Sequence, residues 1–135
     1  MNPVINYLAL DIGSKRIGVA RANSVARLPE PLQVIPNDPD FRSQLDSIIA
    51  EYGADEIIVG LPRSLDGNET DQSQYTRAFV SDNFKNLPVK FQDETLSSVE
   101  AEKRMKIYGL QNRPDMLDAV AACIILEDYM NYESN

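Results

Sequence analysis

The sequence contains no histidine and no tryptophan, and it has one cysteine among its 135 residues. Without histidine, the chain cannot carry a Ser-His-Asp or Cys-His nucleophile, a histidine zinc site or a histidine general base. Cys123 has no second cysteine with which to form an internal disulfide. Any chemistry must therefore come from carboxylates, hydroxyls, Lys, Arg and Tyr.

Long apolar runs are also missing. No run approaches the roughly 18 residues of a membrane span, and the N-terminus lacks the charged-then-apolar pattern of a signal peptide. We therefore expect a cytoplasmic protein with no membrane partner. A chain of 135 residues buries roughly two-thirds of its unfolded surface. We expect one domain over residues 1–135, folded without disulfides or a structural metal.

Basic residues are few, with 13 Lys and Arg against 21 Asp and Glu, for a formal charge of -8. Nonspecific binding to phosphates requires a basic stripe on the protein. The acidic balance therefore argues against a general nucleic-acid coat. A role with nucleic acid must rely on a local cation cluster or on bound divalent metals.

The hydrophobic pattern predicts strands alternating with helices. Two strands around Gly13 suggest an antiparallel hairpin, and Gly53 and Gly109 follow predicted helices as stops. Ser97 and Glu100 fit a capping box, with Leu96 and Ala101 as its hydrophobic staple. The predicted strands are Val4–Leu10, Ile17–Ala22, Leu32–Ile35, Ile57–Val59 and Val89–Gln92; the predicted helices start near Asp38, Gln74, Ser97 and Pro114, and a loop spans Arg63–Ser73.

This order of elements predicts an α/β fold: a mixed five-stranded sheet flanked by helices. The stretch Ala119–Leu126 is apolar on every side, so the last helix is expected to be buried against the sheet. If Asp115 caps that helix, Asp118 is its third residue, where the helix dipole favours an acidic side chain.

Three carboxylates stand at the ends of these core elements. Asp11 follows the first strand, Glu94 follows the last, and Asp118 opens the final helix. Taken singly, each has an ordinary explanation as a turn, strand-end or helix-start residue. In a compact mixed sheet such ends can converge, and clustered carboxylates then need a compensating cation.

Three oxygen ligands without His or Cys suit Mg²⁺ or Mn²⁺. Such metals favour cleavage of phosphodiester bonds, because they can activate water and stabilise the leaving oxygen. The sequence therefore predicts a metal-dependent nuclease site.

Five segments, in this order and at this spacing, resemble the successive signatures of the YqgF (RuvX) family along nearly the whole chain. They are Leu10–Ala20, Asp55–Pro62, Leu65–Glu69, Asp93–Ser98 and Asp118–Ala122. The resemblance implies an RNase H-like fold related to Holliday-junction resolvases, and a nuclease that matures the 5′ end of the 16S ribosomal RNA precursor. It also implies that Asp11, Glu94 and Asp118 are the catalytic residues and the ligands of Mg²⁺ or Mn²⁺.

Some positions depart from the family pattern. Thr95 stands where the family usually has Arg, and Arg63-Ser64 stands where it commonly has Leu-Asn. The segment Leu110–Leu117, usually longer and more basic, contains Arg113 as its one cation. These differences concern the grip on substrate and leave the three acids in place.

The basic residues expected to bind substrate are Lys15, Arg16, Lys103, Arg104 and Lys106. For the last three the alternative is a helix surface, because Glu100 lies four residues before Arg104 and Glu102 four before Lys106. Both interpretations remain open at this point.

The expected partner is nucleic acid: precursor rRNA, and with it ribosomal particles. Two other functions compete: a Holliday-junction resolvase-like DNA nuclease, and a non-catalytic module that binds RNA or protein. An ATPase of the sugar or acetate kinase type is disfavoured, because such enzymes need two domains of this kind and no phosphate-loop signature occurs. Monomer and homodimer both remain open.

Overall fold

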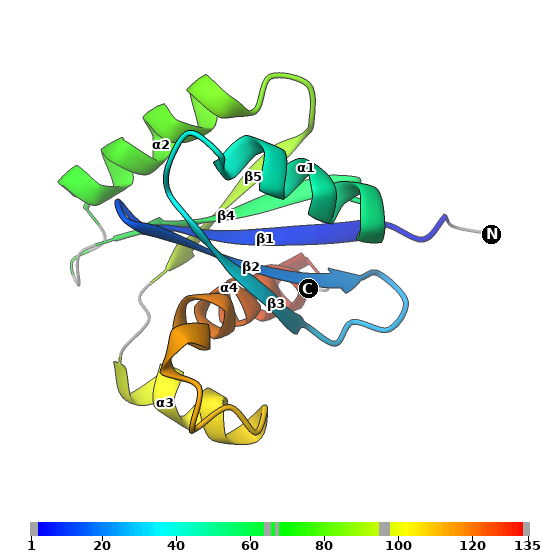
Figure 1. Cartoon of the computed structure of the whole chain (residues 1–135), viewed down its shortest axis with the longest axis vertical. Coiled ribbons are helices and arrows are strands. Elements are labelled where there is room, and N and C mark those ends of the chain that lie inside the picture. The colour runs from blue at the N-terminus through cyan, green and yellow to red at the C-terminus, as the bar shows by residue number, and fades with distance from the viewer. Residues whose placement is uncertain (1–2, 64–65, 67, 95–97, 134–135) are drawn as a thin grey trace.

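The computed structural model describes residues 3–63, 66, 68–94 and 98–133. Five strands form one mixed sheet in the order β3-β2-β1-β4-β5. The first three strands pair antiparallel, whereas β4 runs parallel to β1 and β5 parallel to β4 (Figure 1). The strands are β1 (Asn6–Ile12), β2 (Arg16–Asn23), β3 (Glu30–Pro36), β4 (Glu56–Pro62) and β5 (Val89–Glu94).

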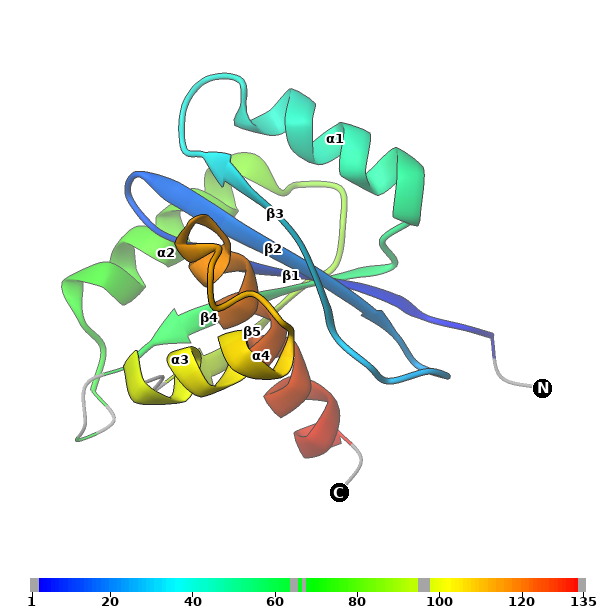
Figure 2. The ribbon, with the colours of Figure 1, turned by 60° about the horizontal axis from the view of Figure 1, so that its bottom comes forward.

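Helices cover both faces of the sheet (Figure 1). On one face lie α1 and α2, and on the other lies α4, with α3 packed against α4 (Figure 2). A short 3-10 turn, η1, leads directly into α4. The bounds are α1 (Phe41–Tyr52), α2 (Asp71–Asn83), α3 (Ser98–Ile107), η1 (Pro114–Met116) and α4 (Leu117–Glu133).

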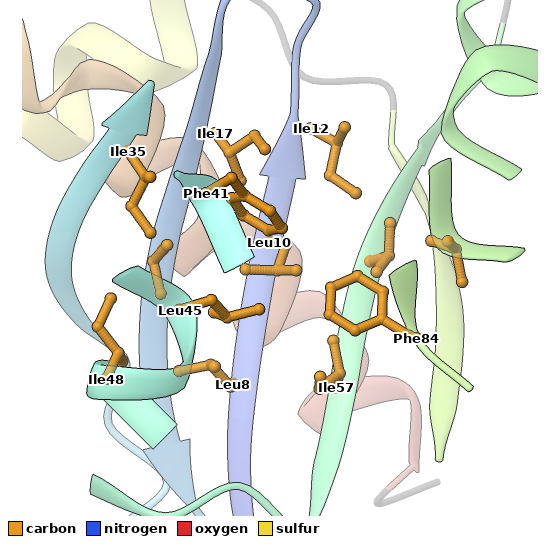
Figure 3. Close-up of a cluster of buried hydrophobic side chains, with 13 residues drawn as sticks. Leu8, Leu10, Ile12, Ile17, Ile35, Phe41, Leu45, Ile48, Ile57 and Phe84 are labelled. Atoms are coloured by element: carbon orange, nitrogen blue, oxygen red, sulfur yellow. The ribbon is translucent and has the colours of Figure 1, made fainter. Parts of the chain in front are cut away.

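The core under α1 and α2 is built from aliphatic and aromatic side chains of the sheet and of the helical layer above it (Figure 3). Leu8, Leu10 and Ile17 rise from the sheet and are fully buried. Phe41 of α1 packs edge-on against Phe79 of α2, with ring centroids 5.3 Å apart. This core fills the space between the sheet and the helices α1 and α2, on the face opposite α4.

The strands contribute several alanines to the core under α4. Ala9, Ala20 and Ile58 face α4 from the sheet and are fully buried, so the helix backbone can approach the strands closely. Every residue of Ala119–Leu126 is buried, which confirms the prediction that this helix lies against the sheet. In the described ranges no helix has the length and apolar character needed to cross a membrane.

All five strands and four helices occur where the sequence predicts them, with shifted ends. Gly53 and Gly109 follow their helices with φ of 81° and 70°, as expected of helix stops. The predicted loop Arg63–Ser73 is too long, because α2 begins at Asp71. The Thr70 hydroxyl accepts from the Ser73 N–H, and the Ser73 hydroxyl accepts from the Thr70 N–H. Because of this reciprocal cap, α2 begins earlier than its apolar pattern predicts.

Two boundaries near the acids differ from prediction. Asp11 lies inside β1, and Glu94 is the last residue of β5. Asp115 does not cap the final helix: it belongs to η1, and Asp118 is the second residue of α4. Thr95, Leu96 and Ser97 lie outside the described residues, and the predicted capping box and staple with them.

Candidate active site

Asp11 and Asp118 are brought together by a glycine. In the β1–β2 hairpin, Asp11 pairs directly with Gly18. A Cβ on Gly18 would stand 1.9 Å from the carbonyl oxygen of Asp118, so only glycine permits this approach of α4. The first turn of α4 therefore rests on β2 beside Asp11.

Glu94 reaches the same face over a second glycine. A Cβ on Gly60 of β4 would stand 2.8 Å from Oε2 of Glu94 and 2.3 Å from Cδ1 of Ile125. The Glu94 side chain thus crosses β4 toward β1, in a space that any other residue at position 60 would fill. The parallel order β1-β4-β5 places Asp11 and Glu94 toward the same end of the sheet.

The electrostatics show that these carboxyls are close. Burial, and then the charge of Asp118, raise the pKa of Asp11 from 3.8 to about 7. Burial, followed by the charges of Asp11 and Asp128, raises the pKa of Glu94 from 4.5 to about 8. Asp11 is therefore the central member, coupled to Asp118 on one side and to Glu94 on the other.

Asp118 is paired with Arg16, a residue that the sequence predicted to bind substrate. Nε of Arg16 donates a hydrogen bond to Oδ2 of Asp118 at 2.9 Å. The position of Arg16 at the start of β2 brings it across to the first turn of α4. The residue expected to grip substrate is thus held by an acid of the site.

Asp128 is an acid that sequence reasoning missed. It lies on α4 and contributes to the raised pKa of Glu94, and burial raises its own pKa as well. The signal available in the sequence was the acidic pair Glu127-Asp128 directly after the apolar stretch Ala119–Leu126. The acidic surface therefore extends from Asp118 along α4 toward Glu94.

The donor set fits a hard divalent cation in kind. Asp11, Glu94 and Asp118 offer only oxygen ligands, and within the described residues the Asp11 carboxylate has neither a hydrogen bond nor an ion pair. Among residues 3–63, 66, 68–94 and 98–133, however, no three such groups are arranged to hold one ion. The three carboxylates thus match the ligand chemistry of such an ion, while Arg16 occupies one oxygen of Asp118.

The remaining basic residues fall into two groups. Lys15, Lys103 and Lys106 are exposed. Arg104, by contrast, is 23% exposed and holds Glu127 of α4 through both terminal nitrogens, with Glu100 at 3.3 Å. The predicted Glu100–Arg104 pair is confirmed, and Arg104 is engaged in joining α3 to α4.

An open hollow of about 740 Å³ adjoins Asp118. Its walls come from β3, the start of β2, η1 and the start of α4, and both arginines Arg16 and Arg113 line it. A smaller hollow of about 370 Å³ lies on the other side of Pro114 and Leu117 and includes Lys106. Arg16 thus lines the same hollow as Asp118, whereas Lys106 lines the neighbouring one.

Comparison with known proteins gives a consistent result. A family model described as "RuvX: Holliday junction resolvase" matches residues 5–132. Proteins named "Putative pre-16S rRNA nuclease" are similar over most of the chain. One from Chloroflexus aggregans is 37% identical, covering 95% of this chain and 94% of its own. One from Paraburkholderia phytofirmans is 42% identical, covering 92% and 86%.

Solved structures resemble the fold at low sequence identity. The Fowlpox virus resolvase, in complex with Holliday junction DNA, has a TM-score of 0.59 at 14% identity, covering 97% of this chain and 100% of its own. Thermus thermophilus RuvC has a TM-score of 0.54 at 15% identity, covering 96% of both chains. The mixed five-stranded sheet is therefore of the RNase H-like type, as the sequence resemblance implied.

Proposed function

Since the chain belongs to the RuvX family of Holliday junction resolvases, we propose that it is a metal-dependent endonuclease that matures the 5′ end of precursor 16S rRNA. The chain is a nuclease by family, and its substrate is nucleic acid. The metal ion, the RNA substrate and the roles of individual residues are proposals that go beyond the family.

The observation that carries the proposal is the state of Asp11. A carboxyl enclosed between two other acids, with its pKa raised to about 7, is about half protonated at neutral pH and is fully ionised there only when a positive charge lies beside it. Asp11, Glu94 and Asp118 would hold Mg²⁺ or Mn²⁺ at this place. When bound, such ions supply Lewis-acid activation of water and stabilisation of the leaving oxygen.

The protein's own residues would orient the substrate strand. Lys15, Lys103 and Lys106 are exposed and able to contact phosphates, whereas Arg104 is left to its role between α3 and α4. Precursor rRNA is favoured because relatives of 35–42% identity over most of the chain carry that name. This substrate implies a cytoplasmic location and contact with ribosomal particles, as a monomer or a homodimer.

Holliday-junction DNA is the second candidate substrate, because the matching family model carries that description. The test is to incubate the protein with precursor rRNA, single-stranded RNA and branched DNA, with Mn²⁺, Mg²⁺ or chelator. Precursor rRNA should be cleaved at its 5′ side in the presence of metal, and branched DNA should be cleaved more slowly.

Asp11→Asn should reduce cleavage at least 100-fold, the order expected when a charge that positions catalytic metals is removed. Asp46→Asn is the matched control, because Asp46 lies on α1 on the opposite face of the sheet, paired with Arg42. Undiminished cleavage by the Asp11→Asn protein would refute the assignment. Binding without cleavage of any substrate would indicate a non-catalytic module.

A further inference from the structure

Arg16 contacts one of the three acids and also lines the neighbouring hollow. Its Nε contacts Oδ2 of Asp118 at 2.9 Å, and the two side chains are 65% and 29% exposed. It also lines the 740 Å³ hollow beside the acids. Asp118 is one of the three proposed metal ligands, so the oxygen that Arg16 holds is one that a metal ion would take.

We propose that Arg16 couples metal binding to nucleic-acid binding: a divalent ion at the acids takes Asp118 away from Arg16, and the released guanidinium then binds a substrate phosphate. This inference rests on the proposed function and adds to it. Without metal, Arg16 neutralises Asp118; with metal bound, Arg16 binds the substrate.

The energies permit this exchange. An exposed ion pair is worth little, because both partners remain well hydrated. A divalent ion between several carboxylates offers Asp118 more than one guanidinium can, since Asp11 and Glu94 share the same ion. The exchange therefore costs little, and it leaves a cation beside the site.

The hollow gives the released side chain a place in which to act. Arg16 shares it with Arg113, whose guanidinium is held by Asp115 through two hydrogen bonds of 2.8 and 3.0 Å. Arg113 has no contact with Asp118 among the described residues, so metal at the acids does not release it. Of the cations in the part of the chain that the structure describes, Arg16 is the one whose contact with Asp118 an ion would replace.

The first measurement uses metal alone. In calorimetric titrations with Mn²⁺ and with Ca²⁺, Arg16→Met should bind the ions about two- to fivefold more tightly than the parent, because the competing cation is gone. Arg113→Met should bind them with the parental affinity. If Arg16→Met and the parent bind both ions equally, Arg16 does not compete for Asp118 and the proposal is wrong.

The second measurement is the affinity for a fluorescent single-stranded RNA, in chelator and in Ca²⁺, with the strand checked for integrity on a gel. The parent should gain affinity with Ca²⁺. Arg16→Met should lose about tenfold in Ca²⁺, as expected for a charged hydrogen bond, and should match the parent in chelator. Arg113→Met should show the same ratio to the parent in both conditions.

An equal loss for Arg16→Met with and without Ca²⁺ would mean a constant phosphate contact and would overturn the coupling. Reciprocity adds a check, since RNA must raise the affinity for Ca²⁺ by the same factor as Ca²⁺ raises the affinity for RNA. Both measurements are independent of turnover. Failure of the proposed nuclease function would appear as uncut substrate with the coupling intact.

Discussion

At the scale of single residues, ionised Asp11 destabilises the folded protein, because its carboxyl is buried and close to Asp118. Its carboxyl is ionised freely in the unfolded chain above pH 4, but in the folded protein it keeps its proton until about pH 7. Glu94 keeps its own until about pH 8. Since the folded state binds more protons than the unfolded state in this interval, the free energy of unfolding falls as pH rises from 4 to 8.

Replacing Asp11 with Asn removes one source of this penalty. In chelator at pH 8, we expect Asp11→Asn to melt roughly 3–6 °C higher than the parent, corresponding to about 1–2 kcal/mol. At pH 5, where the Asp11 carboxyl is protonated in the folded parent but already ionised in the unfolded chain, the difference should be clearly smaller, and it should vanish only below about pH 4. Calorimetric scans at both values test this, and an equal shift at pH 5 and pH 8 would contradict it.

Substitutions of Gly18 and Gly60 should have different effects: the first mainly on the stability of the fold, the second mainly on the position of Glu94. Gly18→Ala sets a methyl against the backbone of Asp118, which cannot yield locally, so it should destabilise the protein by about 3 kcal/mol. Gly60→Ala meets only the side chains of Glu94 and Ile125, so it should cost about 1 kcal/mol. Urea unfolding gives both values.

Cleavage assays complete this comparison. Because its methyl displaces Glu94, Gly60→Ala should lose most cleavage activity while it remains folded at the assay temperature. An active Gly60→Ala protein would show that the position of Glu94 is less restricted than the contacts indicate. The sequence named the acids, but it gave no sign that these glycines hold them together, because the reason is a close approach between distant segments.

At the scale of elements, α3 is attached to the molecule through α4 rather than through the sheet. Arg104 supplies two hydrogen bonds to Glu127, and both side chains are mostly buried. Sequence spacing predicted the local pair with Glu100. It could not predict Glu127, which lies on another helix and is brought near only by packing.

Arg104→Met should therefore act on stability. We expect a loss of about 1–2 kcal/mol, because Glu127 is left without its strongest partner. RNA affinity should stay at the parental level. Lys103→Met combined with Lys106→Met should do the reverse, weakening RNA binding with little effect on unfolding. Urea unfolding and RNA titration of both proteins check this, and reduced RNA affinity of a fully folded Arg104→Met protein would return Arg104 to the substrate surface.

The hydrophobic pattern of the sequence predicts the helices and strands but not all of their ends. The buried helix Ala119–Leu126 was predictable because it is apolar on all sides, and the strands because their apolar runs are short and bounded. The starts of α2 and α4 were not, since they depend on the Thr70–Ser73 cap and on the η1 turn at Pro114. Asp118 consequently lies one residue nearer the start of its helix than predicted.

At the scale of the whole molecule, we expect the proposed metal site to link metal binding to the stability of the fold. With Mn²⁺ at ten times its dissociation constant, binding to the folded site alone adds about 1.4 kcal/mol, which for this size raises the melting temperature by roughly 3–6 °C. Asp11→Asn should show a smaller increment, because a ligand is missing. Scans with Mn²⁺ and with chelator measure both, and equal increments would place the ion elsewhere on this acidic surface.

Sequence reasoning at this scale predicted the α/β class, the mixed sheet and the convergence of three acids. It expected a metal ion to compensate the charge of these acids and did not predict that Arg16 pairs with Asp118. Arg16 and Asp118 are at opposite ends of the chain, and charge counts do not reveal which distant residues meet. The pair emerges only from the packing of α4 across β2.

The order of the acids along the chain has a consequence for synthesis. Asp11 comes from the first strand, Glu94 from the fifth and Asp118 from the last helix. A nascent chain that has completed the sheet still lacks α4, its second core and one of the three acids. With Asp118 as a catalytic acid, as proposed, we expect the chain to stay inert until α4 has been made and packed, and a chain that stops before α4 to yield an exposed apolar sheet face rather than a partly active nuclease.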